Sequence, residues 1–104
     1  MGMELLAKVK ETLRTLYGDR FRGVVLYGSE ARGQARADSD IDFMVLLEGP
    51  VDPWTERKKI LRALYDLQLA VPERHLSFMP VDIEDYESQD YTLFRNVRQE
   101  GVPL

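Results

Sequence analysis

The sequence contains no cysteine, a single histidine, a single tryptophan and no long hydrophobic run. Without cysteine, neither a disulfide framework nor a thiolate zinc site is available. No apolar segment approaches the roughly 20 residues of a membrane-spanning helix, and the N-terminus lacks the apolar core of a signal peptide. The 14 Lys and Arg residues are outnumbered by 18 Asp and Glu residues, which argues against a non-specific nucleic-acid or membrane-surface binder. These absences lead us to expect a cytoplasmic protein.

The composition that remains is that of an ordinary globular protein, with 44% hydrophobic and 31% charged residues in 104 positions. This length predicts one domain over residues 1–104, with a single core and no room for a separate substrate domain. Chemistry beyond the simplest kind would therefore require a partner chain.

Three segments show the hydrophobic spacing of helices. The first covers residues 3–17 and ends at Gly18. The second starts at Pro53, with Asp52 as its cap, and its apolar stripe, which includes Tyr65, continues to about Leu69. The third covers residues 90–100 and is expected to bury Tyr91.

Three short apolar runs predict strands at residues 23–27, 41–47 and 75–81, so the element order is α-β-β-α-β-α. The first two strands are joined by only about a dozen residues and should be antiparallel, whereas a full helix joins the second and third, which should be parallel. The expected fold class is α/β (α+β), a small mixed sheet flanked by helices. In this topology the end of the first strand and the starts of the other two meet at one end of the sheet.

Chemistry-bearing residues gather at that end. Asp40 and Asp42 are two positions apart and should point to one face, about 7 Å apart along the strand. Such a carboxylate pair can bind Mg²⁺, which leaves room for substrate phosphates. Gly28 lets a ligand approach the backbone, and Ser29 offers a hydroxyl and an N–H group to phosphate. The combination points to phosphoryl or nucleotidyl transfer, while each piece alone also fits a solvated surface or a simple turn.

The spacing Gly28-Ser29, ten residues, then Asp40-Ile41-Asp42 resembles the nucleotidyltransferase signature of the DNA polymerase beta superfamily. The longer stretch GSEARGQARADSDIDFMVLL is similar to that of the minimal nucleotidyltransferases, which include the MntA-type antitoxins. The resemblance implies a nucleotidyltransferase fold that uses Mg²⁺ and ATP. It also implies a partner, because such proteins often pair with a HEPN-domain ribonuclease toxin, which the MntA group silences by transferring AMP to a tyrosine.

The resemblance also implies roles for individual residues. Asp40 and Asp42 would hold Mg²⁺, while Gly28 and Ser29 would hold the β and γ phosphates of ATP. Two arginines of the intervening loop, Arg32 and Arg36, would steady phosphate charge, unless they are ordinary surface residues.

One feature of the superfamily is missing, namely a third carboxylate on the third strand. Asp82 is rejected, since it lies roughly 20 Å from the aspartate pair at about 3.3 Å per residue. His75 or Ser77 stands near the start of that strand, and Glu73 is the closest acid. Histidine is a residue type suited to proton transfer, so His75 is taken as a catalytic candidate, with a structural role as its alternative.

Two functions follow. The first is transfer of AMP from ATP to a hydroxyl, with a tyrosine of a HEPN toxin as acceptor, so that this protein acts as the antitoxin. The second is an antitoxin with a weak or inactive site that neutralises its partner by binding. Transfer to a small molecule is disfavoured because no residues are left for an acceptor domain, and no direct nucleic-acid contact is expected.

Overall fold

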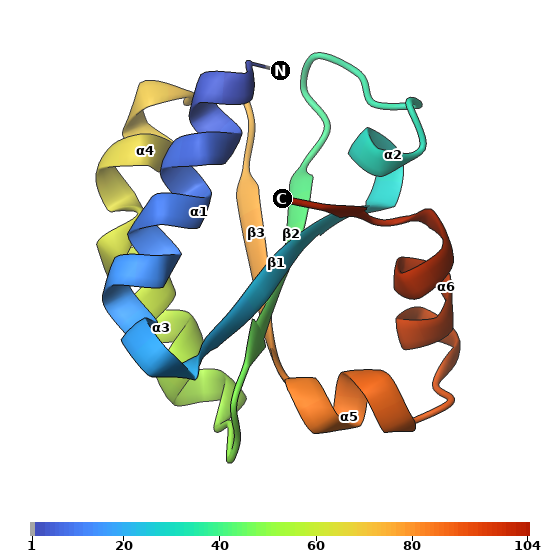
Figure 1. Ribbon diagram of the computed structural model, residues 1–104. Coiled ribbons are helices and arrows are strands. Elements are labelled where there is room, and N and C mark those ends of the chain that lie inside the picture. The colour runs from blue at the N-terminus through green and yellow to red at the C-terminus, as the bar shows by residue number, and fades with distance from the viewer. Residues whose placement is uncertain (1) are drawn as a thin grey trace.

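The computed structural model describes residues 2–104 and is built around a four-stranded sheet with strand order β3-β2-β1-β4 (Figure 1). Strand β1 pairs antiparallel with β2 and with β4, and β2 pairs parallel with β3. Both expected strand relationships are therefore confirmed. The strands are β1 (Phe21–Tyr27), β2 (Ile41–Leu47), β3 (Leu76–Asp82) and β4 (Val102–Pro103).

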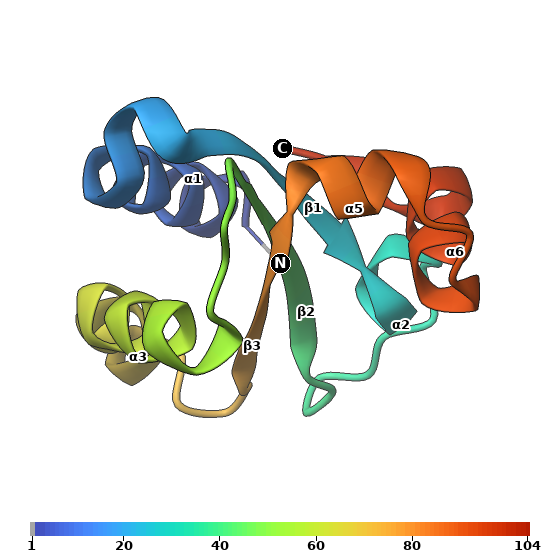
Figure 2. The same cartoon turned by 90° about the horizontal axis from the view of Figure 1, so that it is seen from below.

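Helices cover both faces of the sheet, which confirms the mixed α/β fold class (Figure 2). On one face lie α1 (Met3–Tyr17), α3 (Pro53–Ala63) and α4 (Tyr65–Ala70), and on the other α2 (Gly28–Ala31), α5 (Ile83–Ser88) and α6 (Thr92–Glu100). A short 3₁₀ helix, η1 (Gly18–Arg20), leads from α1 into β1. None of the helices within residues 2–104 combines the length and apolar character that crossing a bilayer requires.

The side chains of β2 alternate between two cores, as the period of a strand requires. Ile41, Phe43, Val45 and Leu47 belong to the larger core with α1 and α3. Met44 and Leu46 belong to a smaller core with Phe94 and Val97 of α6. Asp42 shares the face of Met44 and Leu46, so the carboxylate lies on the side of the sheet that α2, α5 and α6 cover.

The structure differs from the sequence-based prediction in several elements. The helix expected to reach Leu69 is interrupted at Leu64, whose backbone leaves the helical region with φ −104° and ψ 10°. Helix α5 and strand β4 were not predicted, and α6 begins at Thr92, two residues later than expected. Tyr65 and Tyr91, expected in the core, are each 60% exposed.

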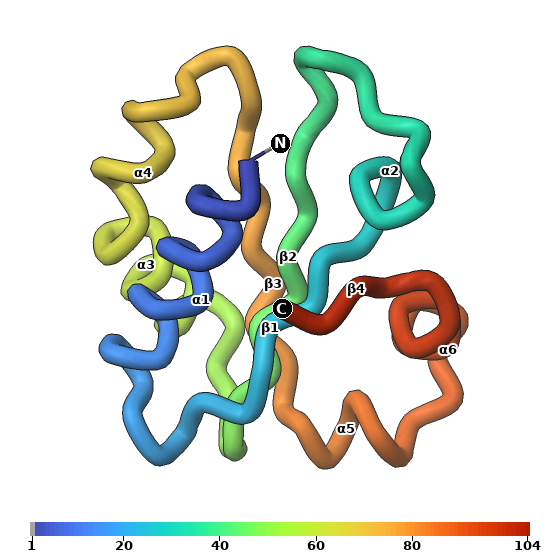
Figure 3. The backbone as a smooth tube through the Cα atoms, turned by 45° about the horizontal axis from the view of Figure 1, so that its top comes forward, coloured from blue at the N-terminus to red at the C-terminus, as the bar shows by residue number. Residues whose placement is uncertain are grey.

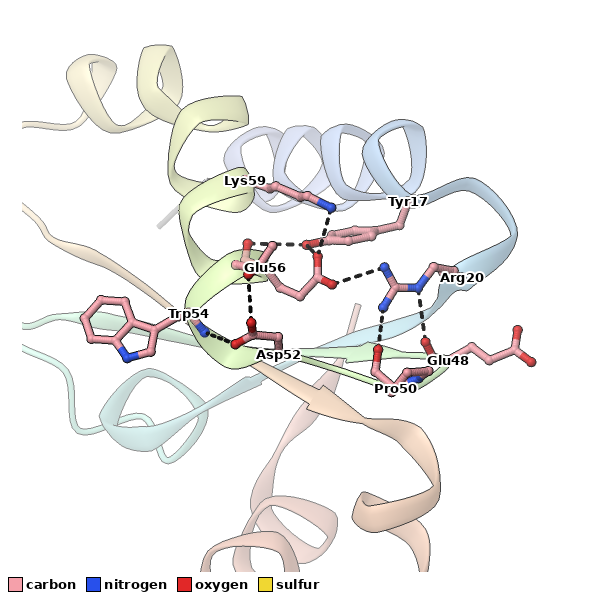
Figure 4. A network of polar contacts seen from close by, with 9 residues as sticks. Tyr17, Arg20, Glu48, Pro50, Asp52, Trp54, Glu56 and Lys59 are labelled. Carbon is pink, nitrogen blue, oxygen red and sulfur yellow. Dashed lines mark hydrogen bonds and ion pairs between the residues drawn. The ribbon is translucent and has the colours of Figure 1, made fainter.

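A network of polar side chains lies at the end of the sheet opposite to the start of β2 (Figure 4). Glu56 of α3 is only 5% exposed and accepts a hydrogen bond of 3.1 Å from the Tyr17 hydroxyl. The Arg20 guanidinium lies 3.1 Å from the other Glu56 oxygen and also donates to the Pro50 carbonyl. Burial and the Glu56 charge both raise the pKa of Tyr17. This network joins α1, η1 and α3, and it is remote from the residues singled out in the sequence.

Candidate active site

The elements that carry the predicted site residues, namely the end of β1 with α2 and the starts of β2 and β3, lie at one end of the sheet, at the top of Figures 1 and 3. Helix α2 begins directly after β1, so Gly28 and Ser29 are its first two residues. Asp40 and Asp42 lie at the start of β2, and His75 immediately precedes β3. The His75 carbonyl accepts a 2.9 Å hydrogen bond from the Ile41 amide, which joins the starts of these two strands.

Gly28 and Asp42 are in close approach across the β1 and β2 pair. Tyr27 is the register partner of Asp42, and the chain turns at Gly28 with a φ of +73°. A Cβ atom on Gly28 would lie 2.4 Å from Oδ2 of Asp42. Glycine is therefore required for two reasons: it adopts a left-handed backbone conformation without strain, and it leaves the carboxylate uncovered. The turn and the Asp42 carboxylate are therefore direct neighbours in space.

Charged residues at this end of the sheet affect the pKa values of Asp42 and Tyr27. Burial raises the pKa of the Asp42 carboxyl, and the negative charge of Asp40 raises it further. The positive charges of His75 and Arg32 act in the opposite direction and lower it. Burial and the Asp42 charge also raise the pKa of the Tyr27 phenol. Asp40, Arg32 and His75 are thus close enough to Asp42 to influence its ionisation.

The two arginines of the loop before β2 differ in position. Arg32 acts on Asp42, donates to the Gln34 side chain and lies 3.9 Å from a carboxylate oxygen of Glu100. Arg36 is exposed and uses its backbone N–H to bond the Ser39 hydroxyl, at 2.8 Å. Its charge is not among the causes that shift the pKa of Asp42. Of the two, Arg32 is the one placed beside the carboxylates.

Strand β3 carries Ser77 beside Asp42, because these two residues are partners in the parallel register. Asp82 pairs with Leu47 at the opposite end, where it caps α5 by accepting a 2.9 Å hydrogen bond from the Glu84 amide. Glu73 is an exposed loop residue. A serine therefore occupies the strand position from which a third carboxylate would reach the aspartate pair.

The donor set fits a magnesium ion that is shared with a substrate. Within residues 2–104 no group of three or more His, Cys, Asp or Glu side chains is arranged to hold a metal. Asp40 and Asp42 provide two hard carboxylates, and their mutual repulsion favours a cation. Mg²⁺ is commonly bound by one or two carboxylates, with phosphate oxygens and water completing its shell. The aspartate pair therefore suits a metal ion that shares its ligands with a substrate better than a structural metal ion that is bound by protein side chains alone.

A groove of about 510 Å³ adjoins this end along β3. It contains Tyr27 and Ser77, which both neighbour Asp42 in the sheet. Its other lining residues include Arg57, Met79, Tyr91 and Phe94, so one cationic side chain accompanies a mainly apolar and aromatic surface. Tyr27 and Ser77 therefore connect this groove to Asp42, which is not itself among the lining residues.

Sequence reasoning missed two contributors to this region. Tyr27 was read only as the end of a strand, although its position before the Gly-Ser turn places it opposite Asp42. Arg74 precedes His75 and forms an ion pair of 2.5 Å with Glu30 of α2. These two residues are 44 positions apart, and no local pattern in the sequence signals their contact.

Comparison with known protein families gives a match over residues 7–104 to the model described as polymerase beta, nucleotidyltransferase. The chain belongs to this family. The match includes the whole of the Gly28 to Asp42 segment, and the predicted resemblance is confirmed.

A curated relative from Methanocaldococcus jannaschii, provisionally named a protein adenylyltransferase, is 30% identical over 60 residues, 58% of this chain. The aligned region spans only 60% of that relative's length. Among solved structures, a mutant of the MntA-HpeT toxin-antitoxin has a TM-score of 0.63 at 21% identity, covering 100% of this chain and 72% of that one. A toxin-antitoxin with AMP-PNP has a TM-score of 0.61 at 19% identity, covering 99% and 72%. These structures share the fold of the family.

Proposed function

We propose that this protein is a Mg²⁺-dependent nucleotidyltransferase that moves AMP from ATP to a protein hydroxyl, with a tyrosine of a HEPN-type toxin as acceptor. The observation that carries the proposal is the close approach of Gly28 to Asp42, which joins a glycine-serine turn to a carboxylate pair. A relative named for protein adenylyl transfer and a toxin-antitoxin neighbour with AMP-PNP support the donor and the kind of acceptor. The protein would act as the antitoxin of a cytoplasmic pair.

In this proposal the glycine-serine turn binds the terminal phosphates of ATP, and the carboxylate pair binds the metal ion that accompanies them. Gly28 and Ser29 bind the β and γ phosphates through the backbone and the serine hydroxyl. Asp40 and Asp42 would hold Mg²⁺, which supplies charge neutralisation for the phosphates and the departing pyrophosphate. Arg32, whose charge already reaches Asp42, adds a second source of positive charge, and Arg36 is a more remote candidate for the same role.

The acceptor approaches from the groove along β3, which includes Ser77 and Tyr27. Its hydroxyl oxygen forms a bond to the α-phosphorus while the bond from that phosphorus to the bridging oxygen breaks, and pyrophosphate leaves. His75 is the proposed acceptor of the hydroxyl proton, since it immediately precedes β3 and its side chain is exposed at the same end of the sheet as Asp42. The aromatic and apolar lining of the groove suits a tyrosine side chain.

The second candidate function is neutralisation of the partner by binding alone. The observation that favours it is Ser77, which stands beside Asp42 where a third carboxylate would complete the metal site. A site with two carboxylates can still bind nucleotide, so the two functions differ in turnover rather than in affinity for ATP.

Intact mass of the partner distinguishes them. A candidate HEPN protein is co-expressed or mixed with this chain, Mg²⁺ and ATP, beside the variants Asp42→Asn and Asp38→Asn. Asp38 is an exposed aspartate of the same loop and serves as the matched control. Transfer predicts a gain of whole AMP units with wild type and Asp38→Asn, and none with Asp42→Asn. A stable complex whose mass never changes would reject transfer and support binding alone.

A further inference from the structure

Arg74 joins the segments that carry the candidate site. Its Nη1 lies 2.5 Å from Oε1 of Glu30, and its Nε donates a 2.8 Å hydrogen bond to the carbonyl of Ser39. The side chains of Arg74 and Glu30 are only 12% and 17% exposed. The contact is therefore a largely buried ion pair with an additional backbone anchor.

Arg74 and both of its partners lie next to candidate site residues in the sequence. Glu30 lies in α2, two residues after Gly28, and Ser39 immediately precedes Asp40. Arg74 itself immediately precedes His75. One guanidinium thus connects the glycine-serine turn and the carboxylate loop to the start of β3, which is more than 30 residues further along the chain.

Residues 32–40, between the turn and the carboxylates, contain neither helix nor strand. The amides of residues 32–34 donate hydrogen bonds back to carbonyls of α2, whereas Arg36 and Ser39 bond each other. Without Arg74, the distance between Gly28 and Asp40 would depend mainly on the strand pairing of β1 with β2.

Stability alone does not account for the arrangement. The free energy needed to desolvate a buried ion pair is about as large as the attraction between its charges. Apolar side chains of similar size would therefore stabilise the fold equally well at these positions. In addition, the buried Nη2 of Arg74 has no hydrogen-bond partner among residues 2–104. The planar, forked geometry of a guanidinium, by contrast, fixes two acceptors relative to each other.

We infer that Arg74 is a positioning residue, which holds the phosphate-binding turn and the carboxylate pair at the separation that one Mg²⁺-nucleotide requires. The inference rests on the proposed function, because it assigns the turn to phosphate and the carboxylates to metal. It predicts that Arg74 controls how strongly Mg²⁺ and ATP assist each other's binding, a coupling that is reciprocal between the two ligands.

The test measures the dissociation constant of ATP by calorimetry with and without Mg²⁺, together with the urea midpoint of each variant. Arg74→Lys retains a positive charge beside Glu30 but loses the fork, and Arg74→Gln and Glu30→Gln remove one partner of the pair. Arg20→Gln is the matched control, because it breaks the ion pair with buried Glu56 at the opposite end of the sheet.

We expect Arg74→Lys and Arg74→Gln to reduce the enhancement of ATP binding by Mg²⁺ about 10-fold, comparable with the loss of an outer-shell partner of a metal site. Arg20→Gln should lower the urea midpoint while leaving this enhancement unchanged. If Arg74→Lys keeps the wild-type enhancement, or if Arg20→Gln loses it equally, Arg74 has a structural role only and the inference is overturned. Failure of the wild-type protein to bind ATP would instead reject the proposed function itself.

Discussion

Gly28 faces Asp42 so closely that a single methyl group on the glycine would lie 2.4 Å from the carboxylate oxygen Oδ2. Such a distance forces the carboxylate or the turn to move, and both belong to the proposed site. Gly33 provides an unusually clean comparison, because its φ of +70° nearly equals the +73° of Gly28, yet a Cβ atom there meets nothing within 4 Å.

The first prediction compares Gly28→Ala with Gly33→Ala. Both substitutions place alanine in the left-handed region and should lower the free energy of unfolding by about 1 kcal/mol from backbone strain. Only Gly28→Ala should also displace Asp42, and it should lower AMP transfer by at least about 10-fold. Urea unfolding and a transfer assay on the same samples measure the two effects. Equal activity of the two variants would contradict the proposed use of the turn.

The second prediction concerns Asp42 and pH. Its folded-state pKa is raised above the ordinary value of 3.8, so between these two values the folded chain binds more protons than the unfolded chain. The free energy of unfolding contributed by this residue therefore falls as pH rises through the folded pKa, and the penalty is fully present at neutral pH. Asp42→Asn removes the penalty and should be more stable than wild type near pH 7 without metal.

The measurement is the urea midpoint of wild type and Asp42→Asn from about pH 3.5 to pH 7, in chelator. The stability advantage of the variant should grow with pH and disappear toward the acidic end, because both forms are then uncharged at position 42. The same variant should lose AMP transfer by at least about 100-fold, the upper end of what an outer-shell partner contributes. A variant that is less stable than wild type at every pH would contradict the electrostatic origin of the shift.

The third prediction adds a carboxylate where β3 has none. Ser77 is the parallel register partner of Asp42, so Ser77→Asp places a third acid on the same face, one strand away. Mg²⁺ affinity should increase about 10-fold, since affinity for hard cations rises with ligand charge, while stability without metal should fall. Met79→Asp is the control, because it adds the same charge two residues further along the strand. Equal Mg²⁺ affinities of the two variants would show that position 77 does not face the metal.

Much of the fold could be predicted because its information is local. The run Ile41–Leu47 was predicted with the bounds that the structure has, and connection length alone gave the correct antiparallel and parallel pairings. Helix α5 was missed because its sequence, IEDYES, is acidic and has only two apolar residues, Ile83 and Tyr86, which are too few to show a helical period. The interruption at Leu64 was missed because the hydrophobic stripe continues across it, so only the backbone dihedrals reveal it.

In the candidate site, too, some residues have a local signal in the sequence and others do not. Gly28, Ser29, Asp40 and Asp42 form a compact pattern within 15 residues, which spacing can reveal. Arg74 acts through Glu30 and Ser39, and its position depends on how β3 docks beside β2. The sequence also gave no reason to separate Arg32 from Arg36, since only the folded loop places one of them beside Asp42.

The repulsion between Asp40 and Asp42 has a consequence for the lifetime of the protein in a cell. A ligand that binds only the folded chain stabilises it by about 2.7 kcal/mol when present at 100 times its dissociation constant. Proteases degrade chains in proportion to the fraction that is unfolded. Under the proposed function, the metal-free chain keeps the repulsion between Asp40 and Asp42, and binding of Mg²⁺ and nucleotide would lower the fraction of chains that is unfolded. The supply of these ligands would then help to set how long each copy survives.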